Sequence, residues 1–102
     1  MNVEKNSEEL GRIEQFIQLF QACYTQTLGQ KPDEKTQLQV LGIDWQDGLT
    51  MRVKKSEITT EAFEKTCEKC GARMFKTTSN YSIKFSSLQE AIEALHQAQA
   101  KA

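Results

Sequence analysis

The stretch LGRIEQFIQLFQACYTQTL, residues 10–28, decides how the rest of the chain is interpreted. Its apolar residues recur every three or four positions, which places a wide apolar stripe along one side of a helix. No other segment is as apolar for its length, so we expect the remaining elements to pack against this helix. The stripe consists of Leu10, Ile13, Phe16, Ile17, Leu19, Phe20, Cys23, Tyr24 and Leu28.

Local signals set the ends of this helix. Ser7 is placed to cap its N-terminus just before two acids, and residues 1–6 are predicted to be a disordered polar extension. Gly29 suits the left-handed residue that follows a helix, and Pro32 prevents the helix from resuming. We therefore expect one long helix that ends at Leu28.

A β-hairpin is predicted to follow. Its second strand, Leu49–Lys54, alternates apolar and polar residues and is therefore expected to be half-buried. A three-residue loop at 46–48, with its glycine left-handed, places Ile43 opposite Met51, whereas a two-residue turn would place an acid there. We prefer the three-residue loop, and Gly42 then indicates a bulge in the first strand.

A second helix is predicted after this hairpin. Thr59 can cap it, and Ile58 and Phe63 occupy the two positions of a hydrophobic staple. Gly71 is expected to end it.

The last third of the chain predicts another hairpin and a final helix. Strands are expected at residues 72–77 and 81–86, with a turn at residues 79–80. Ser87 and Glu90 form a capping box that starts the last helix. The order is therefore α-ββ-α-ββ-α. An α+β fold with a four-stranded antiparallel sheet and three helices on one face would bury every apolar stripe.

The length and composition of the chain favour one small domain. The chain has 102 residues, is 38% hydrophobic and 26% charged, and carries a net charge of −1. No apolar run approaches the roughly 20 residues that span a bilayer, and no signal peptide is evident, so we expect a cytoplasmic protein that does not contact membranes. Three cysteines, an odd number, fit that compartment better than a secreted disulfide framework.

Cys67 and Cys70 form a C-x-x-C motif that allows a redox or a metal site. The pair lies at the C-terminal end of its predicted helix, where the helix dipole disfavours a thiolate, so core packing is the preferred interpretation. A zinc site would need Cys23 and His96 to converge on the pair, and those two have no motif spacing.

Catalytic patterns are missing from the sequence. There is no Gly-rich phosphate loop, no Ser-His-Asp arrangement and no metalloprotease-type histidine pair. The acids fall on polar helix faces, as solvated acids do. We therefore expect no enzyme activity, no catalytic residue and no cofactor.

Charge is segregated along the chain. The predicted strands carry cations, whereas residues 49–55, 72–77 and 81–86 contain no acid. If the helices cover one face of the sheet, the other displays Arg52, Lys54 and Lys84.

The register of the third strand leaves two alternatives. Either Ala72 and Met74 face inward and Phe75 is exposed with Arg73, or Phe75 faces inward and Met74 and Lys76 are outside. The first alternative would give a basic face with one aromatic, which is compatible with single-stranded nucleic acid.

The leading functional hypothesis is a non-enzymatic adaptor or regulatory module. Its basic sheet face would dock an acidic surface of a protein partner, through Arg52, Lys54, Arg73 and Lys84. Binding of single-stranded nucleic acid by the same face is the alternative, and a thiol or zinc site at Cys67 and Cys70 is a further one. Leu19, at the edge of the first helix's stripe, adds the alternative of a homodimer.

Overall fold

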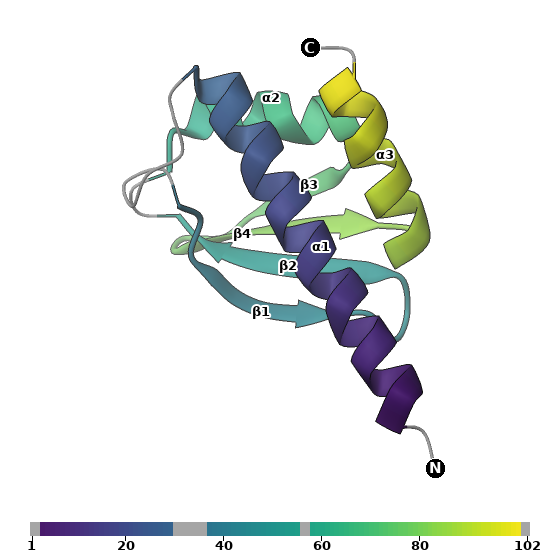
Figure 1. The fold of residues 1–102 in the computed structure, drawn as a ribbon. Coiled ribbons are helices and arrows are strands. Elements are labelled where there is room, and N and C mark those ends of the chain that lie inside the picture. The colour runs from purple at the N-terminus through teal and green to yellow at the C-terminus, as the bar shows by residue number, and fades with distance from the viewer. Residues whose placement is uncertain (1–2, 30–36, 56–57, 101–102) are drawn as a thin grey trace.

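The computed structural model describes residues 3–29, 37–55 and 58–100. Its elements follow the predicted order α-ββ-α-ββ-α (Figure 1). They are α1 (Val3–Leu28), β1 (Val40–Asp44), β2 (Leu49–Lys54), α2 (Thr60–Cys70), β3 (Arg73–Lys76), β4 (Asn80–Phe85) and α3 (Leu88–Ala100).

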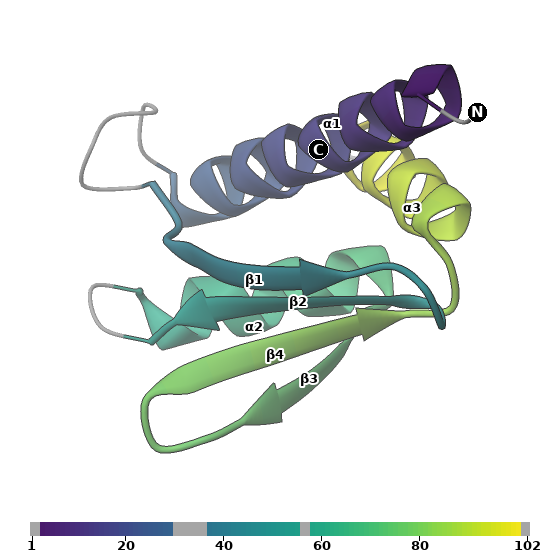
Figure 2. The same ribbon diagram turned by 90° about the horizontal axis from the view of Figure 1, so that it is seen from below.

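The four strands form one antiparallel sheet in the order β1-β2-β4-β3. The two hairpins therefore meet along β2 and β4, and β1 and β3 are the edges. All three helices lie on the same side of the sheet, and none of the described elements covers the other side (Figures 1 and 2). The predicted α+β architecture is confirmed.

One hydrophobic core lies between the helices and the inner face of the sheet. In β2 and β4 every second side chain is buried, which is the alternation expected when one face of an antiparallel sheet is covered. The largest fully buried side chains of the core are those of Tyr81, Phe16, Phe20, Phe63, Leu49, Met51, Ile83, Leu95 and Val53.

The apolar stripe of α1 provides one wall of this core, but its N-terminal end does not. Leu10 is 54% exposed, contrary to the prediction that the whole stripe is covered. That end of the helix projects past the sheet, so no described strand lies beside it (Figure 1). The helix also begins at Val3, so Ser7 lies inside it and not at its cap.

Residues 3–6, expected in a disordered extension, belong to α1, whereas residues 1–2 and Pro32 lie outside the described residues. Glutamate and lysine, which follow Val3, are good helix formers, so the helix can start before its apolar stripe. At the other end the helix stops as predicted, and Gly29 adopts a φ of 79°.

The β1–β2 hairpin has the predicted register. Ile43 lies opposite Met51, and Gly48 has a φ of 83°. The register shifts between Val40 and Gly42, which is the expected bulge, and it brings Val40 back against the core. The bulge therefore lets one short strand present apolar residues to the core on both sides of an irregularity.

The start of α2 differs in detail from the prediction. Thr59 has the extended backbone of an N-cap, but its side chain makes no capping hydrogen bond. Its backbone N–H instead donates to the Tyr24 hydroxyl at 3.0 Å, which ties the start of α2 to α1. Ile58 packs against the core, to which Phe63 also belongs.

The other helix ends follow the sequence signals. Gly71 ends α2 with a φ of 71°. Ser87 caps α3, because its hydroxyl accepts the Glu90 N–H at 3.1 Å. The turn before β4 lies at residues 78–79, one residue earlier than expected, because β4 already begins at Asn80. The Asn80 N–H closes this turn by donating to the Thr77 hydroxyl at 2.9 Å.

Candidate binding face

The register of β3 selects the first of the two predicted alternatives. Met74 lies opposite Ile83 and packs on the core, whereas Phe75 lies opposite Ser82 on the uncovered side. The Phe75 side chain is 53% exposed. Arg73, two residues earlier on the same strand, therefore shares its side of the sheet with Phe75.

Strand pairing fixes the layout of the uncovered side, which we call the open face. It is formed by the outward-facing residues of all four strands in three rows. The row nearest the β1–β2 turn is Asp44, Thr50, Lys84 and Arg73. The middle row is Gly42, Arg52, Ser82 and Phe75. The far row is Lys54 and Asn80.

All four cations predicted to bind a partner are on the open face. Arg52, Lys54, Arg73 and Lys84 are all exposed. Within the described part of the chain, none of the four forms an ion pair. The acid on this face is Asp44, at its β1 edge, and its carboxylate accepts the Gln46 N–H at 3.0 Å.

Gly42 gives Arg52 its position. A Cβ atom at position 42 would lie 2.8 Å from the Arg52 Nη2 atom, so the guanidinium rests directly over the glycine. Arg52 therefore lies across β1, towards that edge of the sheet.

Two hollows mark opposite ends of the open face. The larger, about 570 Å³, lies at the Lys54 end. It is lined by Gln39, Leu41, Lys54, Lys55, Thr78, Ser79 and Asn80. The smaller, about 200 Å³, is lined by Gly71, Arg73, Lys84, Phe85 and Ser86 and is called the Arg73 hollow below.

Sequence reasoning missed most of the residues that line these hollows. On the sequence, Gly71 is expected to end a helix and Ser86 to end a strand, and neither position indicates a binding surface. Leu41 is 46% exposed because it is the extra residue of the β1 bulge. A bulge turns one side chain away from the pattern, and the Gly42 signal could have indicated this.

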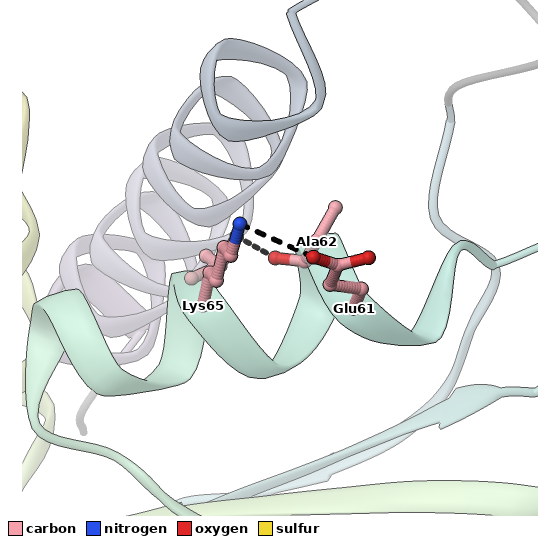
Figure 3. A network of polar contacts seen from close by, with 4 residues as sticks. Glu61, Ala62 and Lys65 are labelled. Carbon is pink, nitrogen blue, oxygen red and sulfur yellow. Dashed lines mark hydrogen bonds and ion pairs between the residues drawn. The ribbon is translucent and has the colours of Figure 1, made fainter.

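Lys76, another strand cation, is not part of the open face. Its ammonium group lies 2.7 Å from the Glu64 carboxylate on α2, on the covered side of β3. The hydrogen bond and the charge of Glu64 raise the Lys76 pKa. On the outer surface of α2, Lys65 lies 3.3 Å from Glu61 one turn earlier (Figure 3). Lys76 and Lys65 therefore each have an acidic partner, which the open-face cations lack among the described residues.

The C-x-x-C pair is buried, as predicted. Burial, together with a smaller effect of the nearby Cys70, raises the pKa of the Cys67 thiol to about 12. Burial likewise raises the Cys70 pKa to about 11. At neutral pH both groups are therefore protonated thiols, which are poor nucleophiles and poor metal ligands.

The four residues of the zinc alternative do not come together. His96 is exposed, and its Nε2 atom lies 3.5 Å from the Gln15 side chain on α1. Among the described residues, no three histidine, cysteine or acidic side chains are grouped to hold a metal ion. Cys70 instead donates a weak hydrogen bond to the Cys67 carbonyl, at 3.6 Å.

Leu19, the residue behind the homodimer hypothesis, packs against the core and widens the contact of α1. The large exposed apolar residues are Leu10, Leu41, Trp45 and Phe75. Self-association stays a prediction.

Within the described ranges, no helix is both long and apolar enough to cross a membrane. Comparison of the chain with protein-family models, with curated proteins and with solved structures finds no match.

Proposed function

We propose that this protein is a non-enzymatic binding module, adaptor or regulatory in kind, whose open face docks an anionic segment of a protein partner. The observation that carries the proposal is the set of four exposed cations without ion-pair partners among the described residues. Charges of one sign gathered on one surface attract and orient a partner of opposite charge.

The spacing of the cations suits an extended acidic segment. Arg52 and Lys54 are two residues apart on β2, which is about 6.8 Å in an antiparallel strand. Acidic side chains at alternate positions of an extended peptide have the same spacing. Lys84 lies opposite Thr50, diagonally from Arg52, and continues the line of cations towards Arg73.

Single-stranded nucleic acid is the second candidate, and the exposure of Phe75 favours it. An exposed ring on a basic sheet can stack on an unpaired base. The overall charge of −1 and the single aromatic of the open face favour the protein partner.

The test removes the charge from the open face. The double variant Arg52→Glu with Lys84→Glu should fold normally and lose binding of a fluorescent polyglutamate peptide, measured by anisotropy at low salt. The matched control is Lys65→Glu with Lys69→Glu, which makes the same change of net charge on α2 and should retain binding.

Equal loss in both double variants would mean that only net charge matters, and it would refute the proposal. Unchanged binding by the open-face variant would refute it as well. A fluorescent oligothymidylate, titrated in parallel, tests the second candidate, whose affinity must fall steeply as salt is added.

A further inference from the structure

Two like charges face each other at one end of the open face. Arg73 on β3 is the direct cross-strand partner of Lys84 on β4. Like charges at directly opposed positions of a sheet are unfavourable. Neither side chain forms an ion pair with another described residue, so this repulsion is not offset within the described part of the chain.

The same two side chains line the Arg73 hollow. Gly71, which carries no side chain, and Ser86, which offers a hydroxyl, complete it together with Phe85. Its volume of about 200 Å³ is below the roughly 300–1,000 Å³ of pockets for whole small molecules. The hollow therefore suits one charged group of a larger ligand.

We propose that the Arg73 hollow binds the phosphoryl group of a phosphorylated residue in the protein partner. This inference rests on the proposed function and names the group that the open face recognises. A phosphoryl group carries about −1.5 to −2 charges at neutral pH and three acceptor oxygens. It therefore neutralises two cations together, whereas a carboxylate neutralises only one.

The two cations have complementary roles towards such a group. Arg73 can donate two parallel N–H bonds to a pair of phosphate oxygens, and Lys84 supplies a point charge to the third. Phe75, on the same side of β3 as Arg73, offers an exposed ring to the residue beside the phosphorylated one.

Compensation of the α2 dipole is the structural alternative. Gly71 ends α2, and cations near a helix C-terminus are stabilised by its partial negative charge. That role predicts a loss of stability when Arg73 or Lys84 is neutralised, and no preference for phosphate. Nucleic acid is disfavoured because the three rows of the open face contain one aromatic, Phe75, and a stacking platform uses several.

The experiment titrates the ¹⁵N-labelled full chain with two blocked tripeptides, Gly-phosphoserine-Gly and Gly-Glu-Gly. We expect saturable amide shifts at Gly71, Arg73, Lys84 and Ser86 with the phosphorylated peptide, and much weaker ones with the glutamate peptide. Arg73→Gln or Lys84→Gln should weaken binding about tenfold or more, because each removes a charge-assisted hydrogen bond. Lys65→Gln removes the same charge on α2, outside the open face, and should weaken binding less than about twofold.

Absence of saturable shifts, equal binding of both tripeptides, or equal loss in Lys65→Gln and Arg73→Gln would each overturn the inference. If polyglutamate still needs Arg52 and Lys84 in that case, the proposed function stands and only the hollow is wrong. If oligothymidylate gives stronger shifts at these residues, and Phe75→Ala reduces them, the phosphate comes from nucleic acid and the phosphoprotein assignment fails.

Discussion

At the scale of single residues, the two glycines of the first hairpin, Gly42 and Gly48, are required for different reasons. Gly48 needs its left-handed backbone, with a φ of 83°, and a Cβ there would lie 2.9 Å from the Phe85 carbonyl oxygen. Gly42 has no such backbone requirement, and what its Cβ would meet is the flexible end of Arg52. Gly48 shapes the turn, and Gly42 makes room for Arg52, which is proposed to bind the partner.

Substitution of these two glycines by alanine should change the stability of the fold by different amounts. Gly48→Ala is expected to lower the free energy of unfolding by about 1–3 kcal/mol, because it adds backbone strain and a contact with a fixed carbonyl. Gly42→Ala should change it by less than about 1 kcal/mol, because Arg52 can move aside. Urea unfolding followed by circular dichroism measures both. Equal destabilisation would show that Arg52 is held as rigidly as the backbone.

The cysteines are a second residue-scale feature with a measurable consequence. The folded protein raises the pKa of Cys67 from 9.0 to about 12, so folding favours the neutral thiol. The contribution of the neutral Cys67 thiol to the stability of the fold is complete below about pH 9. It is lost as the pH rises from 9 towards 12, because in this range the thiol ionises in the unfolded chain but not in the folded one.

The free energy of unfolding should therefore fall as the pH rises above 9, and the fall should be shallower in Cys67→Ala. At pH 8, the three thiols of the native protein should react with Ellman's reagent far more slowly than in urea, because all are buried. Fast reaction of a native thiol would contradict the buried placement.

At the scale of elements, the helix ends show how similar sequence signals lead to different contacts. Ser87 uses its hydroxyl to hold the first turn of α3. Thr59 occupies the same position of α2, yet its side chain makes no capping bond. Its backbone N–H binds Tyr24 of α1, so a contact between helices replaces a contact within one.

This difference predicts unequal effects of alanine. Ser87→Ala should cost about 1 kcal/mol, because the Glu90 N–H loses its acceptor. Thr59→Ala should cost less than about 0.5 kcal/mol, because no side-chain cap is removed and the backbone bond to Tyr24 survives. Thermal unfolding of both variants beside the wild type would reveal the order, and the reverse order would mean that Thr59 caps α2 in solution.

At the scale of the whole molecule, Phe63 of α2 joins the helices to the sheet. Its ring centroid lies 4.9 Å from that of Tyr81 on β4 and 5.7 Å from that of Phe20 on α1. Phe75 lies on the other side of the sheet and is more than half exposed. Phe63 therefore belongs to the core that stabilises the fold, whereas Phe75 belongs to the open face that is proposed to bind a partner.

Alanine at these two positions should change the stability of the fold by very different amounts. Phe63→Ala is expected to cost about 3–5 kcal/mol, a large part of the roughly 5–15 kcal/mol that stabilises a small domain. Phe75→Ala should leave stability within about 0.5 kcal/mol of the wild type. Urea denaturation decides this, and a large loss of stability in Phe75→Ala would mean that its ring is buried in solution.

The sequence by itself determined the order of the elements, the helix-ending glycines and the inner faces of β2 and β4. These follow from local periodicity and from backbone conformations that only certain residues adopt, so they need no knowledge of distant contacts. The burial of Cys67 and Cys70 was predictable for the same reason, because both lie on the apolar face of their helix.

The tertiary structure alone decided the register of β3, the exposure of Leu10 and the meeting of Arg73 with Lys84. Alternation along one strand does not say which of its two sides faces the core, so Phe75 could be placed only by its pairing with β4. The exposure of Leu10 depends on how far the other elements extend along α1, which the apolar stripe does not state. Pairing of β2 with β4 assembled the four cations on one face, because that surface is made by strands from both hairpins.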